Sequence, residues 1–349
     1  MALALGIDVG TSGVRAALLA PSGEVRGLAG ARLSDFGSAR NDPPLWRAAL
    51  EAALAALGRE IALSQVRAVS IDATSGTVLG LDASGAPVGP ALMYDDAVTD
   101  PAIPAAIAAV APRESAAHGA SSGLARALAL QARPGGARIV PQADWMAELL
   151  AGGPVASDES NALKTGYDPV AQRWPDWIAS TGLDPALLPA VVAAGVRTGR
   201  VGAGAFGVPA GAALIAGVTD GCASFLATGA DRPGDGVTAL GSTLTLKLLS
   251  DRPVFAPEAG IYSHRVGDLW LAGGASNSGG AVLAEHFTPE EIAALSERID
   301  PKRNSGLDYY PLRSPGERFP VRDPDLPPRL TPRPEDGADF LHGMLEGMA

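Results

Sequence analysis

The sequence predicts an α/β protein in which mixed sheets are flanked by helices, and three observations lead to this class. The first is a set of three short apolar segments joined by tight turns at the start of the chain. The second is a segment of helical apolar spacing that follows them, and the third is a further pair of apolar runs. A meander, a helix and more strands in this order are typical of a mixed sheet covered by helices.

Each element of the first half follows from a local pattern. The turn at 8–13 is rich in glycine and small hydroxyl residues, and Pro21-Ser22-Gly23 forms a second turn. Apolar residues recur at helical spacing from Pro43, and proline is favoured in a first helical turn. We therefore expect strands over 3–7, 14–19, 24–29, 66–71 and 77–81 and a helix over 43–57.

The second half repeats the pattern of strand, small-residue turn and strand. Its expected elements are strands over 236–240, 244–249 and 269–272, helices starting near 278 and 336, and an extended loop over 308–334. We place a domain boundary between residues 225 and 226, which gives domains of 1–225 and 226–349.

Composition limits the possible partners and compartment. The chain has 349 residues, 47% of them hydrophobic, and a net charge of -11, with lysine only at 164, 247 and 302. An acidic chain without basic runs is a poor partner for nucleic acid or an anionic membrane. The long uncharged stretch 201–219 is broken by glycine and proline, so it predicts no membrane span. Cys222 is the only cysteine, and the first residues lack the cationic region of a signal peptide, so we expect a cytoplasmic protein.

The first turn contains the groups that phosphate binding requires. Gly10 and Gly13 allow backbone N–H groups to approach an anion, and Thr11 and Ser12 add hydroxyl donors. Asp8, at the end of the preceding strand, is suited to holding a hydrated magnesium ion. Arg15 is suited to neutralising phosphate charge. Without further context, an ordinary hairpin turn remains the alternative.

Asp220 is the candidate general base. It follows the apolar run 212–218, which predicts a carboxylate at a strand end, next to a glycine that permits a sharp turn. Phosphoryl transfer to an alcohol benefits from a carboxylate that accepts the hydroxyl proton. From the local pattern alone, a turn-forming aspartate remains the alternative.

Five segments in order resemble the FGGY carbohydrate kinases. Residues 6–16 are similar to that family's N-terminal phosphate motif, which actin, hexokinase and chaperone ATPases share in related form. The other four segments are 70–77, 157–168, 216–223 and Gly316-Glu317-Arg318-Phe319-Pro320. The resemblance implies the two-lobed actin-like ATPase (ribonuclease H-like) fold, with the phosphate loop and sugar pocket in the first lobe. It also implies a second lobe that is incomplete at the C-terminus, because no Gly-Gly-Gly-Ala-x-x-Asn segment for adenosine occurs.

The resemblance also assigns roles to individual residues. Asp220 matches the family's catalytic base, and Mg²⁺ near Asp8 and ATP are the implied cofactors. Nucleotide contacts fall on the first turn, on a second phosphate loop and on a turn that heads a helix: Gly10, Thr11, Ser12, Gly13, Arg15, Gly241, Ser242, Thr243, Gly279 and Gly280. The substrate-side candidates are Asp8, Asp72, Ser75, Asp95 and Asp220. Ser75, Asp72 and Asp95 could equally be cap or turn residues.

The function implied by this resemblance is transfer of the ATP γ-phosphoryl group to a terminal hydroxyl of a ketopentose. The residues of segments 72–77 and 94–96 are most similar to those of the branch that phosphorylates D-ribulose, with D-xylulose as the alternative. Two further hypotheses stay open: a sugar- or nucleotide-binding remnant without catalysis, and an actin-like ATPase or phosphatase without a sugar acceptor. The expected partners are small molecules, and the pattern does not fix the oligomeric state.

Overall fold

A computed structural model describes residues 2–349 of the chain. It forms two compact units. The first contains the residues up to Ala227 together with His264–Asp268, and the second contains Thr228–Ser263 and Leu269–Ala349. Each unit has its own sheet, and each is described here by itself.

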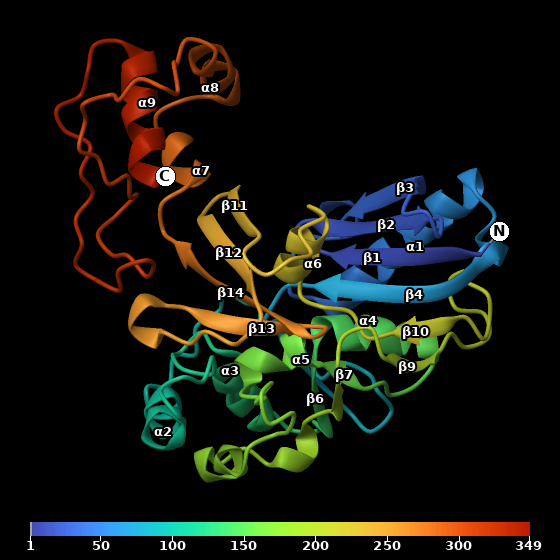
Figure 1. The fold of residues 1–349 in the computed structure, drawn as a ribbon. Coiled ribbons are helices and arrows are strands. Elements are labelled where there is room, and N and C mark those ends of the chain that lie inside the picture. Colours follow the sequence, from blue (N-terminus) through green and yellow to red (C-terminus); the bar gives the residue numbers. More distant parts are fainter. Residues whose placement is uncertain (1) are drawn as a thin grey trace. The chain divides into compact units, whose positions relative to one another are not determined.

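The first unit is built on a six-stranded mixed sheet with the strand order β3-β2-β1-β4-β10-β9 (Figure 1). The strands are β1 (Leu3–Val9), β2 (Gly13–Leu19), β3 (Val25–Arg32), β4 (Val66–Ala73), β9 (Arg197–Arg200) and β10 (Ala213–Ile215). The first three form the expected antiparallel meander. Strand β4 pairs in parallel with both β1 and β10, and β9 closes the sheet in the antiparallel direction.

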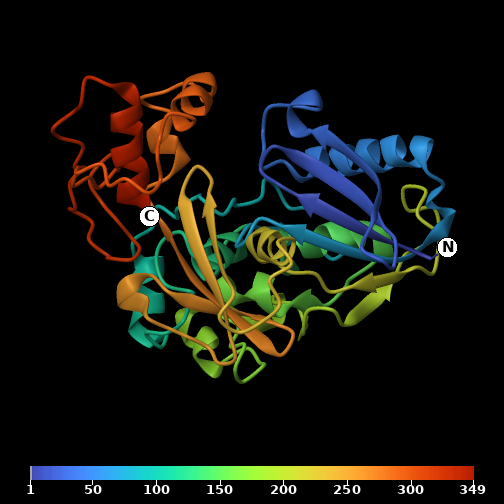
Figure 2. The same ribbon diagram turned by 45° about the horizontal axis from the view of Figure 1, so that its top comes forward.

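Alternating burial explains why the first strand takes its place. Every second residue of β1 from Leu3 to Val9 is buried, as a strand with one face on a core requires. Helix α1 (Pro43–Glu60) buries Trp46, Leu50 and Leu57 on one side and packs against β2 and β3. Figures 1 and 2 show the helix running along this part of the sheet.

The remaining strands and helices of the first unit are divided between the core of the six-stranded sheet, which includes Trp145 and Met146, and a second hydrophobic cluster. These strands are β5 (Val78–Leu81), β6 (Arg138–Pro141), β7 (Ser157–Asp158) and β8 (Val191–Val192), and the helices are α2 (Ala102–Val110), α3 (Gly123–Gln131), α4 (Gln142–Ala151), α5 (Glu159–Ala162) and α6 (Asp220–Leu226). Strands β5 and β6 pair antiparallel, and β7 and β8 pair parallel. The cluster includes Ile107, Leu124, Ile139 and Ile178, all of them buried.

The second unit carries a four-stranded sheet with the order β11-β12-β14-β13. The elements of this part are β11 (Gly236–Leu240), β12 (Leu244–Ser250), β13 (Tyr262–Val266), β14 (Leu269–Ser276), α7 (Gly280–Leu283), α8 (Pro289–Ser296) and α9 (Gly337–Met348). Residues 264–266 of β13 are counted with the first unit. Strand β12 is antiparallel to both β11 and β14. A small core of Leu283, Tyr309, Phe340 and Met344 joins the helices.

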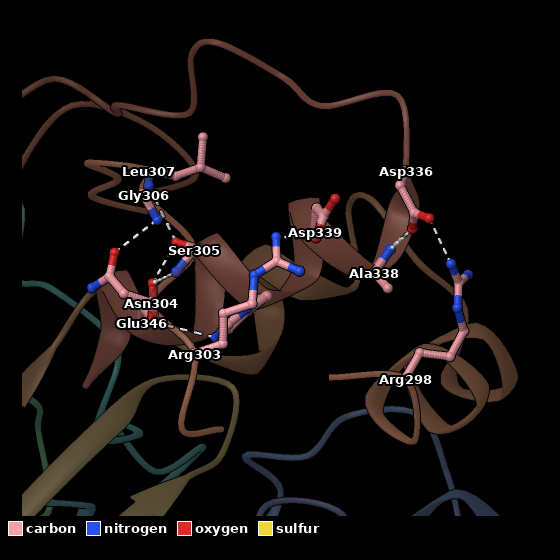
Figure 3. Close-up of polar contacts among 11 residues, drawn as sticks. Arg298, Arg303, Asn304, Ser305, Gly306, Leu307, Asp336, Ala338, Asp339 and Glu346 are labelled. Atoms are coloured by element: carbon pink, nitrogen blue, oxygen red, sulfur yellow. Dashed lines mark hydrogen bonds and ion pairs between the residues drawn. The ribbon is translucent and has the colours of Figure 1, made fainter. Parts of the chain in front are cut away.

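Polar contacts fix helix α9 near both of its ends (Figure 3). At its start, Asp336 accepts a hydrogen bond from the Ala338 N–H at 2.7 Å and pairs with Arg298. Near its end, the Ser305 N–H donates to Glu346 Oε2 at 2.9 Å. The Asp336 carboxylate is an N-cap, which stabilises a helix by satisfying N–H groups of its first turn. The segment predicted as an extended loop, 308–334, runs between these two attachments without helix or strand.

Two sequence predictions of local structure are wrong in detail. The predicted strand over 212–218 is reduced to Ala213–Ile215, and Asp220 begins helix α6 instead of standing at a sharp turn. Regular pairing with β4 ends at Ile215, but the chain stays close to β4: Gly217 lies so near the Ile71 carbonyl oxygen that an added Cβ would be 2.0 Å from it, and Thr219 then bridges Ala73. The helix expected from 278 is only α7, because Thr288 forms a capping box that starts α8 afresh.

Among the described residues, 2–349, no helix has both the length and the apolar character that a membrane crossing needs.

Substituting Gly217 with alanine tests the close approach between this segment and β4. We expect Gly217→Ala to lower the free energy of unfolding by about 3 kcal/mol or more, because the opposing atom is backbone and cannot rotate away. Urea unfolding followed by circular dichroism measures the change. The matched control is Gly199→Ala in β9, where the nearest atom to a new Cβ is Leu214 Cδ1 at 3.8 Å. We expect this control to change the free energy of unfolding by less than about 1 kcal/mol. Equal stability of the two variants would contradict this packing.

Candidate active site

The turn between β1 and β2 holds the predicted phosphate-loop residues. Its backbone is closed by a hydrogen bond from the Gly10 N–H to the Gly13 carbonyl at 3.0 Å. The Ser12 carbonyl accepts a second hydrogen bond from the Leu33 N–H at 2.9 Å, which attaches the turn to the segment after β3. Thr11 and Ser12 are therefore presented on a loop that is held at both sides.

Strand register brings two predicted residues next to Asp8. In the antiparallel pair Asp8 lies opposite Arg15, and in the parallel pair it lies opposite Asp72. Residues that stand opposite each other in neighbouring strands point to the same face of a sheet. Arg15 Nη1 donates to Asp8 Oδ2 at 2.7 Å, so one carboxylate of the site is already paired with a cation.

Asp220 reaches the same place from the start of helix α6. Thr219 is the N-cap of that helix and bridges Ala73, the last residue of β4, which is one residue beyond Asp72. The Thr219 N–H also donates to Ser160 Oγ at 2.8 Å, and Asp220 Oδ1 accepts from the Gly221 N–H at 2.7 Å. The ends of β1 and β4 and the first turn of α6 thus gather three aspartates.

The crowding of carboxyl groups alters the acidity of Asp72. Burial, followed by the negative charges of Asp8 and Asp220, raises the pKa of Asp72 to about 8, although Arg15 opposes the shift. At neutral pH the Asp72 carboxyl group is therefore largely protonated and can donate a hydrogen bond. A cation bound here would relieve the repulsion.

The carboxylates fit a hydrated magnesium ion better than a closed metal site. Within residues 2–349, no group of three or more histidine, cysteine or acidic side chains is arranged to enclose a metal ion. Magnesium usually keeps several waters and binds through one or two carboxylates together with substrate phosphates. Asp8, at the mouth of the turn, remains the predicted residue for such an ion.

The substrate-side candidates Ser75 and Asp95 have different surroundings. Ser75 Oγ is buried and has no hydrogen-bond partner in the structure, so this hydroxyl is able to bond a ligand. Asp95 accepts from Arg40 Nη2 at 3.0 and 2.9 Å through its two carboxylate oxygens. The side chains of Arg40 and Asp95 are both exposed to solvent. Ser75, in contrast, lies in the turn that follows β4, close in sequence to Asp72.

Arg40 also lines a hollow of about 650 Å³ beside the phosphate loop. The hollow is bounded by the phosphate loop, the end of β3 and the segment that follows it: Thr11, Ser12, Gly13, Val14, Arg15, Gly30, Ala31, Arg32, Leu33, Ser34, Asp35, Gly37, Ser38 and Arg40. Three arginines and several hydroxyls face this space, a composition suited to anionic or polyhydroxylated ligands. Asp95 borders the region through its bond to Arg40.

In the second unit, backbone hydrogen bonds bring the two predicted nucleotide turns together. The Gly280 N–H donates to the Gly241 carbonyl at 2.7 Å, and the Ala281 N–H donates to the Ser242 carbonyl at 3.1 Å. Gly279 has φ 139°, and a Cβ at this position would lie 2.7 Å from the Leu244 nitrogen. Only glycine fits such a contact, so the turns of 241–243 and 279–280 form one small structure.

Glu317, within the segment that resembles the Gly-Glu-Arg-x-Pro signature, supports these turns. Its carboxylate accepts from Ser276 Oγ at 2.6 Å, from the Asn277 N–H at 2.7 Å and from Tyr310 Oη at 3.0 Å. Burial alone would raise the pKa of Glu317, but these hydrogen bonds and one from the Arg318 N–H hold it below its usual value. The end of β14, three residues before Gly279, is thereby fixed.

Sequence reasoning assigned no role to Arg40 or to the Glu317 side chain. The partner of Arg40 lies 55 residues away in the chain, a separation that local patterns do not show. The sequence around Glu317 shows only a resemblance to a family motif. The hydrogen-bond partners of the Glu317 carboxylate are Ser276, Asn277 and Tyr310. The sequence therefore indicated the motif at 316–320 but not the contacts that its glutamate makes.

The chain is similar to known sugar kinases in sequence and in fold. None of the protein-family models scanned matches the chain. Over 289 residues the chain is 32% identical to the xylulose kinase of Streptomyces coelicolor, a match that covers 77% of this chain and 59% of that protein. The chain therefore spans less than two thirds of the length of this relative.

Solved sugar kinases have the same fold. The xylulose kinase of Rhodospirillum rubrum matches with a TM-score of 0.80 at 21% identity, over 98% of this chain and 76% of the other. The gluconate kinase of Lactobacillus acidophilus matches with a TM-score of 0.81 at 16% identity, over 99% and 76% respectively. The predicted α/β fold of the actin-like ATPases is confirmed, and the chain is related in sequence to a xylulose kinase.

Replacing Glu317 with glutamine tests its support of the nucleotide turns. We expect Glu317→Gln to lower the free energy of unfolding at pH 7 by about 1.5–3 kcal/mol, because hydrogen bonds to a charged acceptor are lost. Since the folded-state pKa of Glu317 is lowered, its contribution is present above the usual glutamate value and lost as the pH falls through the folded-state value. Urea unfolding from pH 7 to pH 3 measures this. The control, Glu285→Gln at the exposed ion pair with Arg313, should change stability by less than about 1 kcal/mol.

Replacing Asp72 with asparagine tests the crowding of carboxyl groups. Because the folded-state pKa of Asp72 is raised, its proton contributes stability that is complete below the unfolded pKa and is lost as the pH rises to about 8. We expect Asp72→Asn to gain stability relative to the wild type between these values, by up to about 1.4 kcal/mol per pH unit. Urea unfolding of both proteins at several pH values measures the difference. A difference that does not vary with pH would contradict the proposed proximity of Asp8 and Asp220.

Proposed function

We propose that the protein transfers the γ-phosphoryl group of ATP to a terminal hydroxyl of a ketopentose. The observation that carries the proposal is the gathering of Asp220, Asp72 and Asp8 beside a phosphate-type turn, at the ends of β1 and β4. A carboxylate next to a loop of amides and hydroxyls is what in-line phosphoryl transfer to an alcohol requires. The sequence relation to a xylulose kinase and the shared fold support the same reaction.

Each group has a role in this reaction. Asp220 accepts the proton of the attacking sugar hydroxyl and aligns its oxygen. Thr11 and Ser12, with the amides of Gly10 and Gly13, contact the phosphate oxygens, and Arg15 adds positive charge. Asp8 would hold Mg²⁺ through water, and this ion, when bound, neutralises charge on the transferred phosphoryl group.

The second unit would contribute to nucleotide binding. The joined turns present the amides and hydroxyls of Ser242 and Thr243 beside the closely packed backbone of Gly279 and Gly280. Such groups suit the phosphates of ATP. Their common support by Glu317 is consistent with a loop that has to keep its shape.

The sugar side would be formed by Asp72, Ser75 and Asp95. The Asp72 carboxyl group, which is hydrogen-bonded to Asp8, keeps oxygen atoms that can accept from a sugar hydroxyl, and the buried Ser75 Oγ can donate or accept. Recognition of a polyol depends on such groups because an unpaired buried hydroxyl is costly. The similar proteins named above favour D-xylulose as the acceptor. The residues of segments 72–77 and 94–96 favour D-ribulose, so both sugars belong in the first test. With a single cysteine, the chain is also compatible with the cytoplasm, where we propose that it acts.

The proposal predicts ADP release that depends on a sugar and on Asp220. ADP formation from ATP and Mg²⁺ is measured with D-xylulose, D-ribulose, glycerol or no sugar. We expect stimulation by a ketopentose and a loss of about 10²–10⁴-fold in kcat for Asp220→Ala, because the proton acceptor is removed. The control is Asp176→Ala at the exposed pair with Arg173, which should keep wild-type activity.

Two results would contradict the kinase proposal, and a third would contradict the assignment of its base. ADP release that no sugar stimulates would support an ATPase instead. Sugar binding in calorimetry without any turnover would support a binding protein. Full activity of Asp220→Ala would remove the proposed base while leaving the reaction itself intact.

A further inference from the structure

Arg126 is a buried cation that contacts only backbone carbonyls. It belongs to helix α3, its side chain is 1% exposed, and among the ion pairs of the described residues none involves it. Its Nε donates to the Asp96 carbonyl at 3.0 Å and its Nη1 to the Gly76 carbonyl at 2.6 Å. Its Nη2 donates to the carbonyls of Tyr94 and Ser121. One guanidinium group therefore joins three separate segments of the chain.

Two of these segments carry the proposed sugar-side residues. Gly76 directly follows Ser75 in the turn between β4 and β5, and Tyr94 and Asp96 stand on either side of Asp95. Gly76 has φ 88°, and a Cβ added there would lie 3.2 Å from Arg126 Nη1, so the turn is pressed against the guanidinium group. The distance between the two segments is thus set by the size of that group.

The geometry of these bonds requires arginine. A guanidinium group is planar and offers five N–H donors in a fixed fork, whereas a lysine ammonium group has three donors on one atom. Four carbonyls that surround the group from different directions are within reach of the fork but not of a single nitrogen. Burial lowers the pKa of Arg126 to about 10, while the charges of Asp96 and Asp95 raise it, so the group stays cationic at neutral pH.

We propose that Arg126 is a positioning residue for the sugar acceptor. It holds the turn of 75–76 and the segment of 94–96 at a fixed separation, so that Ser75 and Asp95 act on the same acceptor. This inference rests on the proposed function. It goes beyond that function because it assigns acceptor selectivity to a side chain that does not touch the acceptor.

The test substitutes Arg126 with lysine, which keeps the charge and removes the fork. The control is Arg133→Lys, because Arg133 also donates to a carbonyl of a neighbouring segment, Pro90, but through a single bond at 2.5 Å that lysine can replace. Sugar affinity is measured by calorimetry with D-xylulose and with D-ribulose, and KM is measured for sugar and for ATP. We expect Arg126→Lys to weaken sugar binding by about tenfold or more and to reduce discrimination between the two sugars, with KM for ATP unchanged. Arg133→Lys should behave as the wild type.

Hydrogen exchange provides a readout that needs no activity. In Arg126→Lys we expect faster exchange of the amides in 75–77 and 92–96, with unchanged exchange in β1 and α1. Wild-type sugar affinity and exchange in this variant would overturn the inference. Equal losses for sugar and ATP, in proportion to a fall in stability, would show a merely structural role and would also overturn it.

Failure of the proposed function gives a different result. A wild-type chain that binds no sugar would contradict that function and, with it, the acceptor role of Arg126. The exchange rates would still show separately that the guanidinium group holds the two segments.

Discussion

The parallel pairing of β4 with β1 is the interaction on which the candidate site depends. It places Asp72 opposite Asp8, and the opposite edge of β1 brings Arg15 to the same face. Gly217 lets the next segment approach β4 closely enough for Asp220 to join the group from the start of α6. A sheet normally avoids like charges side by side, since they repel each other. Burial and this repulsion together keep Asp72 protonated at neutral pH, which makes it a donor among acceptors.

Local patterns predicted the first meander, the helix after it and the hairpin of the second unit, because burial alternates in strands and recurs at helical spacing in helices. They predicted few of the elements between β5 and β10. The meander from Leu3 to Arg32 and helix α1 follow these periods closely. The same reasoning failed at Asp220, because the close approach of Gly217 to Ile71 and the Ala73–Thr219 bridge involve β4, a strand far away in the sequence. It also assigned no role to Arg126, whose acceptors lie up to 50 residues away. Contacts of this kind depend on the tertiary fold, and no short window of sequence contains them.

The site residues divide according to how they were found. The turn 10–13 and Asp220 were candidates from their local pattern, but an ordinary turn remained the alternative for each until the resemblance to a kinase family was added. Ser75 and Asp95 rested on resemblance, and the structure adds an unpaired buried hydroxyl for the first and an ion pair with Arg40 for the second. Solved structures of the same fold include both a xylulose kinase and a gluconate kinase, so the fold alone does not identify an acceptor.

The central claim is that this constellation delivers a phosphoryl group to a sugar and not to water. Phosphorus NMR of the chain with ATP, Mg²⁺ and D-xylulose or D-ribulose tests it most directly, because a sugar phosphate ester and inorganic phosphate give separate signals. The account predicts an ester signal that grows in step with ADP for one ketopentose. Growth of the inorganic phosphate signal alone, at the same rate with and without sugar, would contradict it.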